Sequence, residues 1–417
     1  YPVSSKSNTF THDAALLIPP TGIGKLWVGT ASLMPDDNVE GFRADVLELL
    51  KGLNSPIYRW PGGNFVSGYD WKDGIGDIDK RPPRKNPAWT GVEHNDVGIH
   101  EFMVLCELLD TEPFIAVNAG LGEVEGALSQ VEYCNGSSDT PMGKWRKANG
   151  HEEPWSVKWW SVGNEMYGDW QLGHMDTGLF VEKHAKFADA MKSVDSDIKL
   201  IAVGDPGRWN EMMLSHNADK MDLISEHFYK QDWHGGGLMS HIKQIPEAIA
   251  DRAEIHRRYR REIPELKGKD IRIAMDEWNY WYGPHIYGEL GTRYYLRDAL
   301  GIAAGINEFS KNTDIIYMAN YAQTVNVIGC IKTNSTHSVY ASTGWALKMY
   351  RDYFGTIPIE ISGETRPFDV AATLTADRKT LVVSVINPTW ESVRFNLNLE
   401  NVNVGADVEL YTLTGPD

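Results

Sequence analysis

The chain has 417 residues, too many for one small core but enough for a large barrel domain with an accessory domain. Its 40 basic and 57 acidic residues give a formal net charge of −17, which argues against nucleic acid and anionic membranes as partners. No run of 18 apolar residues occurs, so the sequence predicts no membrane-spanning helix. Three cysteines, with no CxxC motif or His/Cys cluster of zinc spacing, predict neither a disulfide framework nor a metal site.

Residues 1–24 precede the first strand-like run. The chain begins at Tyr1 rather than at Met, so we expect any presequence to have been removed, and cytoplasmic and secreted locations both remain open. We expect this segment to add strands to a β-domain that the other end of the chain forms.

Eight short apolar runs follow, and longer helical patterns separate them. The runs lie at 25–29, 56–62, 113–120, 157–165, 198–205, 223–229, 271–278 and 315–323. Nearly continuous Val, Ile, Leu and Trp in these runs favours parallel strands that are covered on both sides. Apolar residues at helical spacing predict helices at 41–53, 98–110, 181–194, 245–263 and 292–310.

Eight strand–helix units in this order predict a (β/α)₈ barrel over residues 25–354. A doubly wound open sheet is the alternative, although the number of units favours closure. After residue 354 the pattern changes to short alternating runs broken by turn residues, which predicts an antiparallel β-sandwich domain over 355–417. This segment is short for an independent sandwich, which is why we expect strands from residues 1–24.

Polar residues gather where the predicted barrel strands end. Because active sites of such barrels lie at the carboxyl ends of the strands, these residues are candidates for one shared site: Arg59, Asn64, Asn164, Glu165, His227, Tyr229, Glu277, Asn279 and Gln323.

Two glutamates at the ends of different strands, Glu165 and Glu277, are what glycoside hydrolysis requires. One donates a proton to the leaving oxygen, and the other attacks or activates water. The alternative is that each is a structural ion-pair partner, for example of Arg59, which we expect to bond a catalytic carboxylate. Asp276 precedes Glu277, and strand alternation predicts that it points to the opposite face and is structural.

Aromatic residues near these strand ends are candidates for contact with a sugar ring. Trp89 lies on a long loop after the second strand, and Trp281 lies in the aromatic-rich segment 276–290. His174 either reaches the same pocket or caps a helix.

Four segments together resemble glycoside hydrolase family 51, the α-L-arabinofuranosidases. They are "RWPGGNFVSGYDWKDGIG" (59–76), "WSVGNEMYGDWQLGHM" (160–175), "DEWNYWY" (276–282) and "YAQTVNVI" (321–328). The resemblance runs from about residue 25 to about residue 352, and the C-terminal segment resembles the family's β-sandwich domain. One motif departs from the pattern, because the family usually carries "FIEH" on its first strand, whereas "IGKLWVGTASLMP" (23–35) has neither Glu nor His.

The resemblance implies a retaining enzyme that needs no cofactor, with Glu165 as acid/base and Glu277 as nucleophile. It implies that Asn164 binds the sugar 2-hydroxyl, and that Asn64, Tyr229 and Gln323 line the sugar subsite, which Trp89 walls. We expect His227, Arg59 and Trp281 to complete the substrate-binding set, and the resemblance also allows a homo-oligomer.

The predicted activity is release of non-reducing terminal α-L-arabinofuranosyl residues from plant polysaccharides or oligosaccharides. It requires the two carboxyl groups to lie about 5–5.5 Å apart and the pKa of the acid to be raised before attack. One alternative keeps the chemistry but changes the substrate, as in an endo-β-1,4-glucanase, a xylanase or another furanosidase. Another is a catalytically silent carbohydrate-binding protein.

Overall fold

A computed structural model describes residues 22–25, 34–231, 235–282, 291–400, 405 and 407–415. Every helix and strand below lies in the compact unit formed by residues 34–417. Within the described ranges, no helix is long and apolar enough to cross a membrane.

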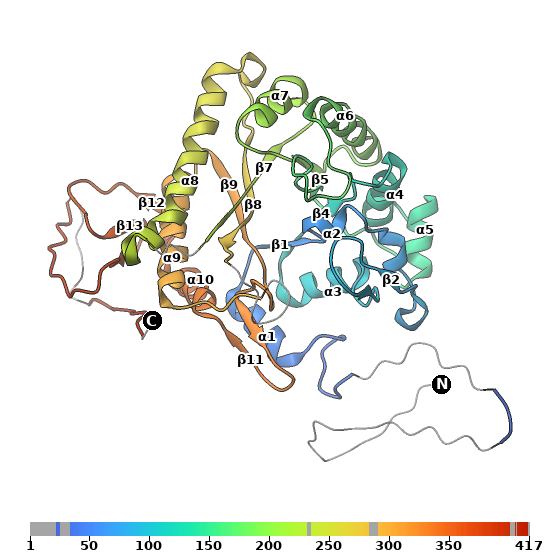
Figure 1. The fold of residues 1–417 in the computed structure, drawn as a ribbon, viewed down its shortest axis with the longest axis horizontal. Helices are drawn as coiled ribbons and strands as arrows, with labels where there is room; N and C mark the ends of the chain where they lie inside the picture. The colour runs from blue at the N-terminus through green and yellow to red at the C-terminus, as the bar shows by residue number, and fades with distance from the viewer. Residues whose placement is uncertain are drawn as a thin grey trace. The chain divides into compact units, whose positions relative to one another are not determined.

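A seven-stranded parallel sheet forms the centre of this unit (Figure 1). Its strands are, in spatial order, β1 (Ile57–Trp60), β4 (Glu112–Val117), β5 (Trp159–Val162), β6 (Lys199–Ala202), β7 (Leu223–Lys230), β8 (Arg272–Tyr280) and β9 (Ile316–Tyr321). The two outer strands β1 and β9 also approach each other, so the sheet is a nearly closed barrel. Seven predicted strands are therefore confirmed, while the run 25–29 lies, except for Lys25, outside the described residues.

Helices surround the sheet on its outer side (Figure 1). Five match predicted ones: α1 (Ala44–Leu53), α3 (Ile99–Leu109), α6 (Thr177–Val194), α8 (Gly237–Glu262) and α9 (Leu296–Lys311). The sequence analysis missed α2 (Gly63–Val66), α4 (Val124–Asn135), α5 (Pro141–Ala148), α7 (Arg208–Asn217) and α10 (Ser342–Tyr353), and the short 3₁₀ turns η1 (Trp71–Gly74), η2 (Ile78–Lys80) and η3 (Pro264–Leu266). The prediction of an α/β barrel is confirmed.

The strands are buried on both faces, as their continuous apolar sequence predicted. One set of alternate residues joins five successive strands in a small cluster made by Phe114, Trp159, Ile201, Leu223 and Ala274. The neighbouring residues pack against the helices, as Trp160 does in a larger cluster with Phe180 of α6. Barrel strands held on both faces give their carboxyl ends fixed positions.

The C-terminal segment contains an antiparallel sheet of β12 (Ile357–Ile359), β13 (Asp369–Leu374) and β14 (Leu381–Ile386). It is joined to α9 by a hydrogen bond from Asn307 Nδ2 to Asp369 Oδ1, 2.6 Å long. Two hairpins, β2 (Arg84–Lys85) with β3 (Val92–Glu93) and β10 (Ile331–Thr333) with β11 (Ser338–Tyr340), extend loops of the barrel. The expected strands of residues 1–24 concern a segment that is, except for 22–24, outside the described residues.

Candidate active site

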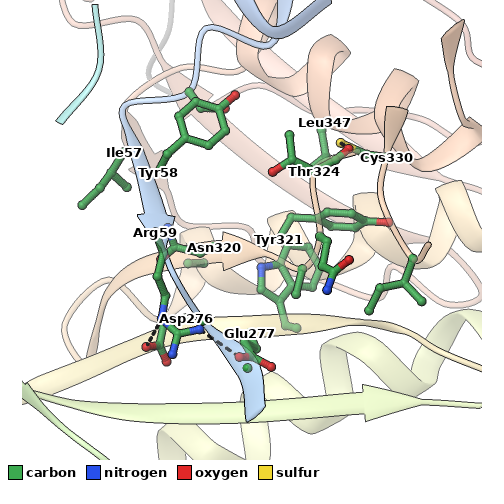
Figure 2. A pocket seen from close by; sticks show the side chains of 18 of the residues that line it. Ile57, Tyr58, Arg59, Asp276, Glu277, Asn320, Tyr321, Thr324, Cys330 and Leu347 are labelled. Atoms are coloured by element: carbon green, nitrogen blue, oxygen red, sulfur yellow. Dashed lines mark hydrogen bonds and ion pairs between the residues drawn. The ribbon is translucent and has the colours of Figure 1, made fainter. Parts of the chain in front are cut away.

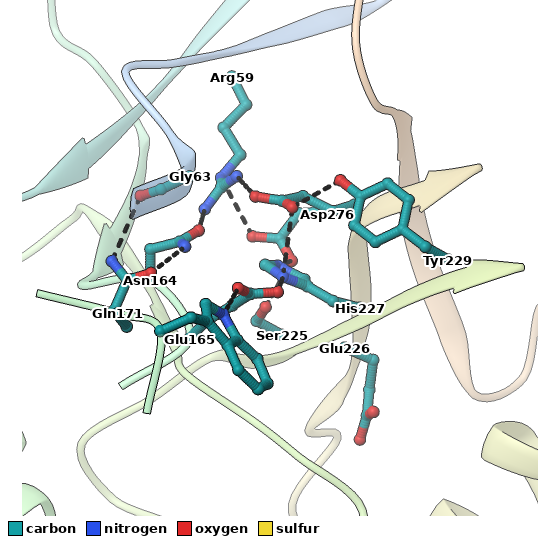
Figure 3. Close-up of polar contacts among 12 residues, drawn as sticks. Arg59, Gly63, Asn164, Glu165, Gln171, Ser225, Glu226, His227, Tyr229 and Asp276 are labelled. Atoms are coloured by element: carbon teal, nitrogen blue, oxygen red, sulfur yellow. Dashed lines mark hydrogen bonds and ion pairs between the residues drawn. The ribbon is translucent and has the colours of Figure 1, made fainter. Parts of the chain in front are cut away.

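Side chains from four barrel strands meet at one end of the sheet (Figure 3). Arg59 comes from β1, Glu165 follows β5, His227 lies on β7, and Asp276 and Glu277 lie on β8. Arg59 and the three carboxylates line a cavity of about 1110 Å³. Figure 2 shows Arg59, Asp276 and Glu277 at one end of this cavity and Tyr58, Thr324 and Leu347 toward the other. Six of the nine residues that the sequence analysis grouped at one rim line this cavity: Arg59, Asn64, Glu165, Tyr229, Glu277 and Gln323. Asn164 and His227 contact two of them, Arg59 and Glu165.

Glu277 on β8 is held by two donors, one from β1 and one from β7. Arg59 Nη1 donates to its Oε1 at 2.8 Å, and the Tyr229 hydroxyl donates to its Oε2 at 2.7 Å. Burial and the charge of Glu277 raise the pKa of Tyr229 well above its ordinary value, so this hydroxyl stays a donor. Both oxygens of Glu277 are therefore held in one orientation.

Glu165 lies in a turn rather than in a strand. Gly163 has φ +92° and Glu165 has φ +43°, the left-handed region that residues other than glycine seldom adopt. Its Oε2 accepts from Trp170 Nε1 at 2.6 Å, and its Oε1 lies 2.9 Å from His227 Nδ1. The turn directs the carboxylate of Glu165 toward the one on β8.

Asp276 contradicts the expectation that it would point to the opposite face. Between β7 and β8 the register shifts, so that Ser225 pairs with Ala274 but His227 pairs with Glu277. One extra residue on β8 makes this a β-bulge, which breaks the simple alternation of sides. Asp276 therefore lies on the side of Glu277, where its Oδ1 is 3.0 Å from His227 Nε2 and its Oδ2 is 3.3 Å from Arg59 Nε.

His227 lies between two carboxylates, one on each ring nitrogen. Burial alone would lower its pKa, but the charges of Glu277 and Asp276 raise it well above its ordinary value. A cationic imidazolium donates through both nitrogens and so satisfies both neighbours at once. The described site thus places two cations, Arg59 and His227, among three carboxylates.

The pKa of Glu165 does not follow the expectation for a resting acid. Burial favours its neutral form, but the hydrogen bond and charge of His227 outweigh burial and lower its pKa. The expectation of a raised pKa in the free protein was therefore wrong, because it took no account of a cationic partner. The lowered pKa of Glu165 and the raised pKa of His227 both favour an ion pair between the two side chains.

The carboxylates of Glu165 and Glu277 lie close to each other. One oxygen of Glu165, one oxygen of Glu277 and one nitrogen of His227 all lie within 4.8 Å of one another. Inverting enzymes hold their carboxyl groups farther apart, about 6.5–9.5 Å, to leave room for water. The same three atoms are spaced closely enough to hold a metal ion, although His227 already forms hydrogen bonds there.

The other predicted site residues either bond neighbouring parts of the site or line the cavity. Asn164 is buried and accepts from Arg59 Nη2 at 2.6 Å, so it is tied to the same guanidinium as Glu277. The amide of Asn64 bonds the backbone of Trp170 and of Leu172 and so holds the loop after β5. The remaining members line the cavity: Trp89, Trp281 and Gln323.

Three residues with a part in the site were missed. Trp170 bonds Glu165, Gln171 lies 3.3 Å from Asn164, and Ser225 donates to Asp276. Trp170 and Gln171 stand in the quoted segment "WQLGHM", where proximity to Glu165 was the available signal. His174 is exposed, with its Nδ1 3.0 Å from the carbonyl of Gln171, and is absent from the cavity wall as described.

A nearly closed parallel barrel with two facing glutamates at its carboxyl end defines a glycoside hydrolase of the barrel class. Residues 49–248 match the α-L-arabinofuranosidase 1 domain, and residues 276–417 match the α-L-arabinofuranosidase C-terminal domain. The chain belongs to the α-L-arabinofuranosidases of glycoside hydrolase family 51. The resemblance seen in the sequence motifs is confirmed.

Individual relatives support this assignment. A probable α-L-arabinofuranosidase C of Aspergillus clavatus is 34% identical over 92% of this chain and 81% of its own length. An intracellular exo-α-L-arabinofuranosidase of Bacteroides ovatus is 32% identical over 82% of this chain and 69% of its own. The solved structure of a thermostable family 51 α-L-arabinofuranosidase from Thermotoga petrophila is 35% identical, with TM-score 0.76, and covers 86% of this chain and 77% of that one.

Proposed function

We propose that this glycosidase releases non-reducing terminal α-L-arabinofuranosyl residues from plant polysaccharides or oligosaccharides, with retention of configuration. The observation that carries the retaining mechanism is the close approach of the Glu165 and Glu277 carboxylates, with atoms within 4.8 Å. The family and the names of the relatives support the arabinofuranosyl substrate.

The reaction is a double displacement. Glu277, oriented by Arg59 and Tyr229, attacks the anomeric carbon, and the bond to the leaving oxygen breaks as that oxygen takes a proton from Glu165. Water then attacks the glycosyl ester, Glu165 takes the proton from that water, and Glu277 leaves as a carboxylate. The cavity residues Asn64, Gln323, Trp89 and Trp281 are the proposed sugar contacts.

His227 supplies the proton that Glu165 donates. Because the raised pKa of His227 favours its protonated form, transfer along the 2.9 Å contact from Nδ1 to Oε1 would prepare Glu165 as an acid. Asp276 keeps the other ring nitrogen protonated and oriented throughout. In the second step the proton returns by the same path.

Exo action is proposed because the Bacteroides ovatus relative is named an exo-enzyme. The test is digestion of arabinan and arabinoxylan by the purified protein, with products separated by chromatography. Release of free arabinose with an unshortened backbone supports exo action. Early appearance of xylo-oligosaccharides supports the endo-acting alternative instead.

The stereochemical test uses 4-nitrophenyl α-L-arabinofuranoside in the presence of methanol. Retention gives methyl α-L-arabinofuranoside, which proton NMR distinguishes from the β-anomer that inversion would give. A panel of 4-nitrophenyl furanosides and pyranosides tests the substrate, and turnover of β-glucoside or β-xyloside alone would overturn the assignment. Wild-type protein that binds sugars but cleaves none would support the silent binding protein.

A further inference from the structure

The loop after β9, residues 322–330, forms one wall of the cavity. Gln323, Thr324, Val327 and Ile328 line the cavity together with Glu277. The loop belongs to no long helix or strand, so its shape depends on the bonds that its backbone makes with neighbouring side chains.

Asn279 bonds both ends of this loop. Its side chain is fully buried, and its Nδ2 lies 2.5 Å from the carbonyl oxygen of Ala322 and 2.8 Å from that of Ile328. The same nitrogen lies 2.7 Å from the Tyr294 hydroxyl, which is itself 2.9 Å from the Ile328 carbonyl oxygen. One amide and one phenol therefore bridge two backbone positions that are six residues apart in sequence.

The middle of the loop has a backbone that needs such support. Asn326 and Val327 both lie in the left-handed region, at φ +56° and +46°. A β-branched residue is strained there, and strain of this kind persists only when surrounding bonds determine the conformation. The Val327 carbonyl accepts from Thr292 N at 3.0 Å and from Lys332 Nζ at 2.8 Å.

Asn279 also connects this loop to the proposed nucleophile. It stands two residues after Glu277 on β8, so both side chains leave the same face of the strand. Their partners on β7 are Tyr229 and His227, respectively. The strand that positions Glu277 thus also positions the loop that carries Gln323.

We infer that Asn279 is a positioning residue of this enzyme, which fixes loop 322–330 and acts on sugar binding through Gln323 without touching the sugar. Tyr294 and Lys332 assist it at Ile328 and Val327. The inference rests on the proposed function, in which Gln323 contacts the arabinofuranosyl unit. Loss of Asn279 releases the loop and leaves the nucleophile and acid/base in place.

The test is a double-mutant cycle with Asn279→Ala and Gln323→Ala, measured on 4-nitrophenyl α-L-arabinofuranoside. Each single change is expected to raise KM about tenfold with kcat nearly unchanged, because uniform binding is lost. The double variant is expected to match the singles, since both changes remove one contact. A hundredfold rise in the double variant, or a loss in kcat alone, would overturn the inference.

Two further variants keep the test decisive if Asn279→Ala does not fold. Tyr294→Phe removes the hydroxyl that contacts Asn279 and the carbonyl oxygens of Ile328 and Tyr280, and its KM effect must also disappear in a Gln323→Ala background. Asn217→Ala is the matched control, because Asn217, at the end of α7, is a buried amide that donates to the carbonyl oxygen of Val181 in α6. It is expected to lower Tm without changing KM. An inert wild-type protein would contradict the proposed function, whereas an active one with independent effects contradicts only this inference.

Discussion

The two glutamates of the site are positioned in different ways. Glu277 lies within a nine-residue strand that is buried from Ile273 onward, and two strand residues hold its oxygens. Glu165 lies three residues beyond the four-residue β5, in a left-handed turn, and its partners are a ring nitrogen and an exposed indole. The nucleophile, which must stay in one place and one charge state, is fixed by regular structure. Glu165, which gains and loses a proton in the proposed reaction, lies instead in a turn outside the strand.

The largest expected effect tests the roles of the two carboxylates. Glu277→Gln removes the nucleophile and should lower kcat/KM at least about 10⁴-fold for every leaving group. Glu165→Gln should cost about 10²–10⁴-fold with a sugar leaving group but much less with 2,4-dinitrophenol, which needs little proton donation. Steady-state kinetics on both substrates measures the difference. Equal losses on both substrates in both variants would contradict the assignment.

The second prediction concerns the proton shared by Glu165 and His227. In the wild type, His227 has a raised pKa and keeps the pair protonated well above pH 6.5. In His227→Gln the proton must stay on a carboxylic acid alone, whose ordinary pKa is about 4.3. The alkaline limb of the kcat/KM profile should therefore move to lower pH. An unmoved limb would show that the imidazole does not hold this proton.

A smaller effect is expected from the turn before Glu165. A Cβ on Gly163, at φ +92°, would lie 3.1 Å from Ala119 Cβ and 3.2 Å from Met166 Cγ. Gly163→Ala should cost about 1–3 kcal/mol of stability and lower kcat about 10- to 100-fold by displacing Glu165. Gly150→Ala is the control, because Gly150 has φ +97° with open space around it. The control should lower Tm, measured by calorimetry, and leave kcat unchanged.

The smallest expected effect concerns the pH dependence of stability and compares two buried histidines, one on α6 and one on α8. On α6, His184 is fully buried with a backbone carbonyl as partner, and burial lowers its pKa to about 4. On α8, the buried His241 has the carboxylate of Asp298 at 2.8 Å. Because the folded pKa of His184 is depressed, its contribution to stability is complete above pH 6.5 and is lost as pH falls from 6.5 toward 4.

The corresponding variant is His184→Gln, which keeps a donor but does not titrate. Its Tm should fall less than that of the wild type between pH 7.5 and 5.0, where protonation costs the wild type up to about 2 kcal/mol. The exposed His216 on α7 provides the control variant His216→Gln. Identical acid sensitivity in all three proteins would contradict the prediction.

Much of the fold was predictable because barrel strands are continuous apolar runs. The seven described strands fall within the predicted runs or differ from them by one or two residues. The missed helices α4, α5 and α7 each carry a buried polar residue, namely Gln130, Arg146 and Asn210. Periodicity alone cannot show burial that depends on hydrogen bonds formed in the fold.

The site was predictable in membership but not in its bonding. Strand ends bring Arg59, Glu165 and Glu277 to one cavity, as expected from the topology. The place of Asp276 depends on a bulge that alternation cannot reveal, and the lowered pKa of Glu165 depends on His227 reaching it across two strands. Such features arise from register and charge pairing, which become visible only in three dimensions.

Arg59 links the two halves of the active site through a single side chain. Its planar guanidinium bonds Glu277 through one terminal nitrogen and Asn164, the neighbour of Glu165, through the other. The spacing between the two halves of the site is thus set by a rigid chemical group of constant size rather than by the curvature of the sheet. Small movements of the strands, or changes in strand packing during evolution, can therefore alter the barrel. The guanidinium still keeps the distance between Glu277 and Asn164 nearly constant.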